Sequence, residues 1–274
     1  MPEAGPAGVG PLVGADWLTA HLGEVRVVDV RWYLDGRSGR AAYESGHLPG
    51  AVWLDIDADL SDPASPAAGR HPLPAPERFA SALARAGIAE GTPVVAYDDA
   101  GGSIAARLWW LLDVLGEPAA VLDGGLAAWP GPLTTAVPDV VPVSRAARPW
   151  PDERFVSADE LADGDGFAVF DARTAQRYAV GDPAIDPRPG HVPGALSAPW
   201  AGNLDGGGRF RPARELRDRF AAAAGRRAVT YCGSGVTACH DLLALRLAGF
   251  DDLALYPGSW SQWGADPSRP AETS

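Results

Sequence analysis

Short apolar runs alternate with helical segments rich in Arg, Ala and Leu along most of the chain. Four of these runs have the length of a β-strand: residues 25–30, 93–97, 167–170 and 228–231. Strands that alternate with helices across short loops predict parallel βαβ units, with helices on both faces of each sheet. The pattern therefore predicts an α/β fold, and in such sheets ligands bind at the carboxyl ends of the strands.

The same series of landmarks occurs twice. The runs at 25–30 and 167–170 both lead into Asp-x-Arg, and each is followed by Gly-His-x-Pro-Gly-Ala, at 46–51 and 190–195. Each half then continues with a helical segment, a second strand, a Gly-containing loop, an amphipathic helix and a Gly/Trp segment. This internal repeat predicts a duplicated domain.

The length of the chain suits two domains, and a Pro-rich stretch without periodicity separates the two halves. We predict an N-terminal domain over residues 1–130, an extended linker over 131–152 and a C-terminal domain over 153–274. Each domain is expected to be a parallel sheet flanked by helices on both faces.

Composition excludes several classes of protein. The net charge of −12 argues against nucleic acid as a partner, and no apolar run is long enough to cross a membrane. Met1–Gly14 contains no secretory signal, which predicts a cytoplasmic protein. Two cysteines and scattered histidines make neither a disulfide framework nor a metal site, so we expect no metal and no cofactor. The absence of lysine excludes a lysine Schiff base.

The most informative stretch is Ala228–Asp241, in which an apolar strand stops at Cys232 and a loop with Gly233 and Gly235 leads into a helix. Backbone N–H groups in such a loop can converge on one point and hold a sulfur anion, the nucleophilic form of cysteine. The alternative is a buried, inert cysteine at the end of a core strand. Cys239, inside the following helix, is expected to be inert.

The duplication separates shared scaffold from chemistry that only one half carries. His47 and His191 occur in equivalent motifs, which favours a structural role for both. Asp98 stands in the first half where Cys232 stands in the second. Because a carboxylate cannot act as a sulfur nucleophile, thiol chemistry is predicted for the second half only.

This combination of a duplicated α/β domain, two Gly-His-x-Pro-Gly-Ala motifs and one cysteine loop resembles the tandem-domain rhodanese sulfurtransferases along nearly the whole chain. The loop at 232–240 is similar to that of the family members that use 3-mercaptopyruvate. The resemblance implies that Cys232 takes a sulfane sulfur from a donor, stores it as a persulfide and passes it to a thiol such as thioredoxin, or to cyanide. The loop residues implied to cradle the sulfur are Gly233, Gly235, Val236 and Thr237.

The resemblance also implies roles for residues outside this loop. Ser234 would relay a proton together with Asp57 and His71 of the first half, although a Ser between glycines is often only a turn residue. Arg177 and Arg188 would hold the carboxylate and keto oxygen of the donor, since guanidinium offers a planar fork of donors. The alternative for these two arginines is a solvated loop.

Three other functions remain to be compared with a mercaptopyruvate sulfurtransferase. Thiosulfate could be the donor, but family members that use it tend to have cationic residues directly after the cysteine, where this chain has Gly233 and Ser234. A phosphatase of the Cys-x5-Arg kind needs an arginine at the position of Ala238. A non-enzymatic sulfur carrier or binding module would not require the intact cysteine loop.

Overall fold

The computed structural model describes residues 9–164 and 166–273, which fall into two compact units. The first unit contains the chain up to Ser61 together with Pro74–Trp150. The second contains Asp62–Leu73 and the chain from Pro151 onward. This division differs from the sequence-based boundaries in two ways: most of the expected linker belongs to the first unit, and residues 62–73 belong to the second. Part of the N-terminal stretch 1–14, residues 1–8, lies outside the described residues.

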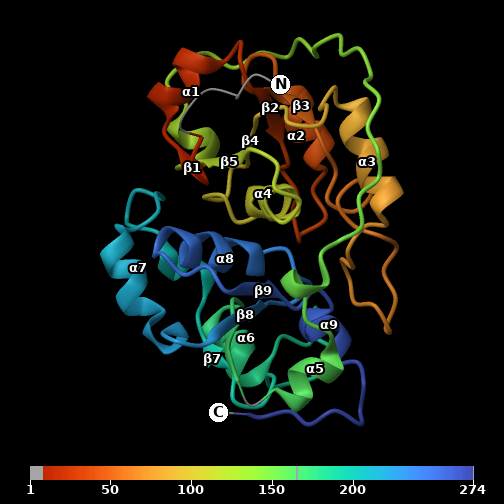
Figure 1. Cartoon of the computed structure of the whole chain (residues 1–274), viewed down its shortest axis with the longest axis vertical. Helices are drawn as coiled ribbons and strands as arrows, with labels where there is room; N and C mark the ends of the chain where they lie inside the picture. Colours follow the sequence, from red (N-terminus) through yellow and green to blue (C-terminus); the bar gives the residue numbers. More distant parts are fainter. Residues whose placement is uncertain (1–8, 165, 274) are drawn as a thin grey trace. The chain divides into compact units, whose positions relative to one another are not determined.

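The first unit is built on a five-stranded parallel sheet (Figure 1). Its strands, in spatial order, are β1 (Leu12–Val13), β5 (Ala119–Leu122), β4 (Val94–Tyr97), β2 (Arg26–Asp29) and β3 (Val52–Trp53). Its helices are α1 (Ala15–His21), α2 (Gly39–Ser45), α3 (Pro76–Arg85), α4 (Ala105–Asp113) and the short 3-10 helix η1 (Gly125–Ala128).

Helices cover both faces of this sheet because alternate strand residues point to opposite sides. Ala15 and Leu18 of α1 pack in one core with Val95 and Tyr97 of β4 and with neighbouring strand residues. Helix α4 contacts β4 and β5 but contributes nothing to that core, and its residues from Ala105 to Leu112 are buried. It therefore packs on the opposite face, as the nearly continuous apolar sequence of α4 requires.

The second unit is built on a four-stranded parallel sheet. Its strands, in spatial order, are β7 (Leu196–Ser197), β6 (Phe167–Asp171), β8 (Arg227–Tyr231) and β9 (Leu253–Leu255). Its α-helices are α5 (Ala158–Asp163), α6 (Ala175–Val180), α7 (Ala213–Arg219), α8 (Ala238–Leu247) and α9 (Ser259–Trp263). Its 3-10 helices are η2 (Asp152–Arg154), η3 (Trp200–Asn203) and η4 (Ala221–Ala223). The predicted class, two parallel sheets flanked by helices, is confirmed.

The two sheets have the same topology, since the order β7-β6-β8-β9 of the second unit repeats the order β3-β2-β4-β5 of the first. The repeated motifs build equivalent scaffolds. Arg31 forms a buried ion pair with Asp29 and donates to a carbonyl of the Gly-His motif, and Arg173 does the same with Asp171. His47 stacks on the ring of Tyr43, as His191 stacks on that of Tyr178. The structure agrees with the structural role expected for these histidines.

The Pro-rich segment between the halves is an extended strap on the first unit. The backbones of His47 and Thr134 exchange two hydrogen bonds, and the N–H of Val143 donates to the carbonyl of Ala84 at 3.0 Å. Arg145 forms a buried ion pair with Glu117 at 2.8 Å. Prolines prevent this segment from forming helix or sheet, so side chains and isolated backbone hydrogen bonds hold it in place.

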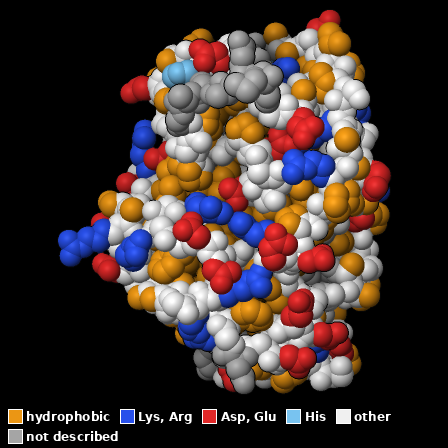
Figure 2. Space-filling view, in the orientation of Figure 1, with side chains coloured by type: hydrophobic (Ala, Val, Ile, Leu, Met, Phe, Trp, Pro, Cys, Tyr) orange, Lys and Arg blue, Asp and Glu red, His pale blue; other side chains and the backbone are white. Residues whose placement is uncertain are grey.

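On the face drawn in Figure 2, acidic side chains lie among basic ones, consistent with a chain rich in Asp, Glu and Arg. Among the described residues, no helix combines the length and the apolar character needed to cross a bilayer.

Candidate active site

Cys232 follows directly after β8, at the carboxyl end of a central strand of the second sheet. Its side chain is only 2% exposed, and its Sγ accepts hydrogen bonds from the backbone N–H groups of Ser234 at 3.4 Å and Gly235 at 3.1 Å. Gly235 has φ +80°, and a Cβ there would lie 2.7 Å from the carbonyl oxygen of Pro257. The glycine is therefore required for the loop to turn its N–H groups toward the sulfur.

The turn that begins α9 is hydrogen-bonded to the backbone of the cysteine loop. The N–H of Trp260 donates to the carbonyl of Cys232 and the N–H of Ser261 to that of Gly233, both at 2.9 Å. The N–H of Cys232 donates to Oγ of Ser259 at 3.2 Å. The backbone on both sides of the cysteine is thus fixed by one neighbouring turn.

Ser234 and His71 form a buried pair beside the cysteine. Nδ1 of His71 lies 2.7 Å from Oγ of Ser234, and the two residues are 2% and 6% exposed. His71 belongs to residues 62–73, the orange loop beside α9 in Figure 1, which is grouped with the second unit. The N–H of Arg70 anchors this loop by donating to Oγ of Ser261 at 2.9 Å. A serine hydroxyl bonded to an imidazole can relay a proton.

Arg177 is brought to the loop by α6, whose first turn is capped by the side chain of Thr174. Its guanidinium forms two hydrogen bonds with Asp186, from Nε at 2.9 Å and from a terminal nitrogen at 2.5 Å. Burial alone would raise the pKa of Asp186, but the hydrogen bonds and charge of Arg177 outweigh burial and hold that pKa below its ordinary value. A Cβ on Gly233 would lie 2.7 Å from Arg177, so the guanidinium lies directly over the loop.

Arg70 lies over the same loop, and the sequence analysis did not single it out. A Cβ on Gly233 would lie 2.9 Å from its terminal nitrogen, and its other terminal nitrogen donates to the carbonyl of Ile185 at 3.2 Å. Burial is the largest effect on the pKa of Arg70 and lowers it. The charge of Cys232 opposes burial, repulsion from Arg177 adds to it, and attraction to Asp186 opposes it more weakly.

The guanidinium of Arg70 forms no direct ion pair with a carboxylate of the described residues. Its Nε is buried without a hydrogen-bond partner, and within residues 9–164 and 166–273 no Asp or Glu forms an ion pair with it. Because arginine stays protonated in proteins, Arg70 brings a positive charge to the loop, which interacts with Cys232 and Asp186 without a direct ion pair. The sequence placed Arg70 next to His71, but no local signal showed that this loop packs on the second unit.

Arg188 and Asp57 each form a hydrogen bond with a residue outside the cysteine loop. Arg188 donates to the carbonyl of Arg269 at 2.7 Å, and its guanidinium lies 5.8 Å from the ring centre of Trp260. Asp57 belongs to the first unit, where its Oδ2 accepts a hydrogen bond from Nε1 of Trp32 at 2.9 Å. The roles expected for both residues stay predictions.

The rest of the loop leads into α8. The carbonyls of Val236 and Thr237 accept the first backbone hydrogen bonds of this helix, from Cys239 and His240. Cys239 is fully buried, and its Sγ donates to the carbonyl of Gly235 at 3.3 Å, as expected for an inert thiol. Among the described residues, no group of three or more His, Cys, Asp or Glu side chains is arranged to hold a metal ion.

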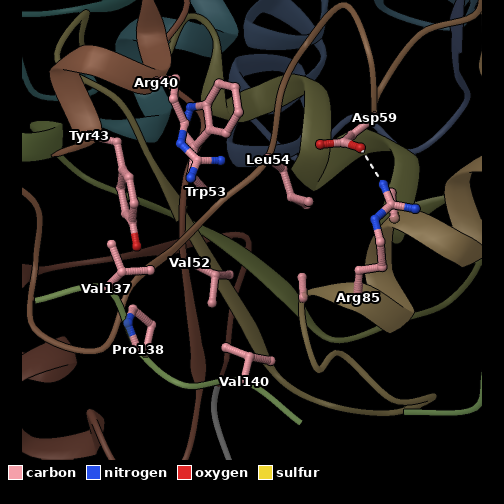
Figure 3. Close-up of a pocket in the computed structure, with 12 residues that line it drawn as sticks. Arg40, Tyr43, Val52, Trp53, Leu54, Asp59, Arg85, Val137, Pro138 and Val140 are labelled. Carbon is pink, nitrogen blue, oxygen red and sulfur yellow. Dashed lines mark hydrogen bonds and ion pairs between the residues drawn. The ribbon is translucent and has the colours of Figure 1, made fainter. Parts of the chain in front are cut away.

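The first unit has a pocket of about 260 Å³ of its own, between α2, α3, the edge strand β3 and the strap (Figure 3). Arg40 lies near the indole of Trp53 and forms an ion pair with Glu44. Arg85 forms an ion pair with Asp59 on one side of the pocket, drawn as a dashed line in Figure 3. Both cations of this pocket form ion pairs with carboxylates, unlike Arg70 in the second unit.

Comparisons with known proteins agree with the duplicated fold and the cysteine loop. Residues 14–131 and 156–266 match the rhodanese-like domain family. The chain is 43% identical to a probable 3-mercaptopyruvate sulfurtransferase of Pseudomonas aeruginosa, over 96% of this chain and 98% of that protein. It is 36% identical to a putative thiosulfate sulfurtransferase of Mycobacterium tuberculosis, over 90% of each.

A solved structure gives the same result for the fold. The crystal structure of the 3-mercaptopyruvate sulfurtransferase of Escherichia coli superposes with a TM-score of 0.78 at 32% identity, covering 91% of this chain and 98% of that one. With both halves matched to one domain family and the resemblance seen in the sequence confirmed, the chain belongs to the rhodanese family and is one of its tandem-domain sulfurtransferase enzymes.

Proposed function

We propose that this enzyme moves a sulfur atom from 3-mercaptopyruvate to an acceptor through a persulfide on Cys232 and releases pyruvate. The observation that carries the proposal is the position of Sγ, in a cradle of backbone N–H groups with Arg70 and Arg177 over the adjoining Gly233. The similarity to proteins named 3-mercaptopyruvate sulfurtransferases supports this donor.

In the first half-reaction, the thiolate of Cys232 attacks the sulfur of the donor. The new S–S bond forms as the C–S bond of mercaptopyruvate breaks, and the electron pair of that bond leaves on carbon as the enolate of pyruvate. The enolate takes up the proton that the donor thiol carried, giving pyruvate and an anionic persulfide. We propose that Ser234 and His71 relay this proton, because their side chains are hydrogen-bonded at 2.7 Å beside the sulfur. Asp57 joins this proposal on the family resemblance alone.

The donor is an anion, and its charge has to be met by the protein because the loop itself is neutral. We assign its carboxylate to Arg70 and Arg177, whose guanidinium groups converge over Gly233. Arg188 is kept as a second-rank candidate for the keto oxygen, since its terminal nitrogen is already bonded to Arg269. The N–H groups of Gly233, Val236 and Thr237 are proposed to stabilise the outer sulfur of the persulfide, together with those of Ser234 and Gly235.

In the second half-reaction, an acceptor thiolate attacks the outer sulfur, which restores the thiolate of Cys232 and carries the persulfide away. Thioredoxin, a small thiol or cyanide would serve, and cyanide would leave as thiocyanate. We propose that the enzyme works in the cytoplasm, where reducing conditions keep Cys232 and thiol acceptors in the reactive form.

Thiosulfate is the second candidate donor. The relative from M. tuberculosis is named for it, and the two guanidinium groups of Arg70 and Arg177 over Gly233 also suit a doubly charged anion. Steady-state kinetics with both donors and one acceptor decide between them. We expect a higher kcat/KM for 3-mercaptopyruvate, and a higher value for thiosulfate would overturn the donor assignment while leaving the persulfide chemistry intact.

The persulfide itself can be detected directly. Protein treated with either donor in the absence of an acceptor should gain the mass of one sulfur atom, located at Cys232 by peptide mass spectrometry. Protein that gains no sulfur from either donor would instead be a non-enzymatic binding module.

A further inference from the structure

We infer that Ser259 is a positioning residue for the nucleophile. Its hydroxyl fixes the backbone N–H of Cys232 and so sets the direction of Sγ. The strained backbone of Ser259 is retained because it keeps this hydroxyl in place. The inference rests on the proposed role of Cys232 as the sulfur carrier. It assigns Ser259 no contact with the donor.

The backbone of Ser259 is in an unfavourable conformation. Its φ is +53°, and among the described residues it is the only one other than glycine with a positive φ. A side chain in the left-handed region brings Cβ close to the following carbonyl, and serine is not a residue that commonly adopts it. Strain of this kind persists only when the surrounding structure holds it in place, and it is often found at functional sites.

The hydroxyl of Ser259 both accepts and donates a hydrogen bond inside the protein. The side chain is fully buried, its Oγ accepts from the N–H of Cys232 at 3.2 Å, and its O–H donates to the carbonyl of Tyr256 at 3.1 Å. The donated bond fixes the orientation of the hydroxyl, so the lone pair that faces Cys232 is fixed as well.

Three successive residues of one turn hold the peptide groups on both sides of the nucleophile. Ser259 binds the N–H of Cys232, and the N–H groups of Trp260 and Ser261 bind the carbonyls of Cys232 and Gly233. The Cα–Cβ direction of Cys232 follows from these peptide planes. The same planes decide whether Sγ meets the N–H groups of Ser234 and Gly235.

The first half of the chain provides an internal control. There, the N–H of Leu126 donates to the carbonyl of Asp98 at 2.8 Å, as that of Trp260 donates to Cys232, so Gly125 occupies the position of Ser259. Gly125 has φ +55°, almost the same as Ser259. The turn thus requires this conformation in both halves, and glycine provides it without strain where no cysteine has to be positioned.

The test uses two substitutions that separate the hydroxyl from the strain. Ser259→Gly removes the hydroxyl and relieves the strain, whereas Ser259→Ala removes the hydroxyl and keeps it. We expect both variants to form the persulfide about tenfold more slowly, because the backbone N–H of Cys232 loses its hydrogen bond, with KM for the donor nearly unchanged. The melting temperature of Ser259→Gly should not fall below that of Ser259→Ala.

A second measurement needs no sulfur donor and so remains informative if the proposed function is wrong. The rate at which iodoacetamide alkylates Cys232 is followed against pH by mass spectrometry, and its midpoint should move to higher pH in both variants. Parent protein that forms no persulfide would overturn the proposed function, and the alkylation profiles would still test Ser259. A Ser259→Gly variant with parental rates and an unchanged alkylation profile would show that the residue serves only the turn.

Discussion

The two halves contain the same loop, and a different side chain accepts its hydrogen bonds in each half. In the first unit, the carboxylate of Asp98 accepts four backbone hydrogen bonds of 2.7 to 2.8 Å, from the N–H groups of Ala100, Gly102, Ile104 and Ala105. In the second, Sγ of Cys232 accepts two, from Ser234 and Gly235. A strand, a tight turn and a helix N-terminus thus form an anion cradle in both units. The first cradle is filled by the chain itself.

The difference shows how one scaffold can be structural in one half and reactive in the other. The two oxygens of the carboxylate bind the N–H groups of the loop and so stabilise it. Helix α4 begins seven residues after Asp98, whereas α8 begins six residues after Cys232. A single sulfur uses fewer N–H groups and leaves those of Val236 and Thr237 without a bond to Sγ, within the part of the chain that the structure describes. In the proposed reaction, these N–H groups would be the donors that a second sulfur meets.

The largest effect is expected from replacing the sulfur of the second loop by oxygen. Cys232→Ser should lower turnover by at least about a thousandfold, because no other group can hold the transferred sulfur. The matched variant Cys239→Ser should largely retain turnover, since that thiol is bonded inside α8. Equal losses in the two variants, measured with the same donor and acceptor, would show that the nucleophile is misassigned.

Removing the carboxylate of Asp98 from the first loop should lower the stability of the protein and leave kcat/KM unchanged. Asp98→Ala leaves four buried N–H groups without their acceptor, which should lower the free energy of unfolding by about 3 kcal/mol or more. Urea denaturation measures this loss, and kcat/KM is measured under conditions in which the variant is folded. A normal stability, or a loss of kcat/KM in the folded variant, would contradict the division of roles between the halves.

Removing the charge of an arginine should also change kcat/KM by different amounts in the two units. Arg70→Met removes a cation that forms no direct ion pair beside the sulfur and should lower kcat/KM for mercaptopyruvate about tenfold to a hundredfold, mainly through KM. Arg40→Met, in the pocket of the first unit, removes a cation already paired with Glu44 and should change kcat/KM less than about twofold. Similar KM values for Arg70→Met and the parent enzyme would remove Arg70 from the donor site.

The last prediction concerns the pH dependence of stability and a fully buried carboxyl group, that of Asp241. Asp241 of α8 accepts one hydrogen bond, from the amide of Asn203 at 2.6 Å, its Oδ2 has no partner, and burial raises its pKa to about 8. The folded protein therefore keeps a proton that the unfolded chain loses near the ordinary value of 3.8. Stability must fall between these two pH values, by at most about 1.4 kcal/mol per pH unit.

Asp241→Asn removes this ionisation and should lose less stability than the parent as the pH rises from about 5 to about 8. Urea denaturation at both pH values measures the difference, which should reach about 1 kcal/mol or more. A constant difference between the two proteins at both pH values would show that Asp241 does not titrate in this window.

Local sequence patterns were sufficient to predict the fold, and the role of Cys232 as nucleophile stays a prediction. The apolar runs and the repeated Asp-x-Arg and Gly-His motifs predicted the parallel sheets and their duplication, because each of these signals lies within a few residues. The glycines around Cys232 predicted a loop that turns N–H groups toward its sulfur. Comparing the two halves also identified Asp98 as the counterpart of the cysteine.

Features that depend on packing between distant segments could not be predicted. The loop that carries Arg70 belongs to the second unit through contacts with α9, and no periodicity indicates such a contact. The guanidinium of Arg188 is bonded to Arg269, far along the chain. The strain at Ser259 is equally invisible in sequence, since a serine in a turn is ordinary and only its backbone angle is unusual.

Residues 62–73 have a consequence for any attempt to divide this protein. The half that contains Cys232 is incomplete when it is produced from Pro151 onward, because His71 and Arg70 are encoded before the strap and the whole of α4. During synthesis, Arg70 and His71 leave the ribosome long before β8, the strand that leads to Cys232. The two halves of the sequence therefore do not encode two independent modules, since a loop within the first half is grouped with the second unit.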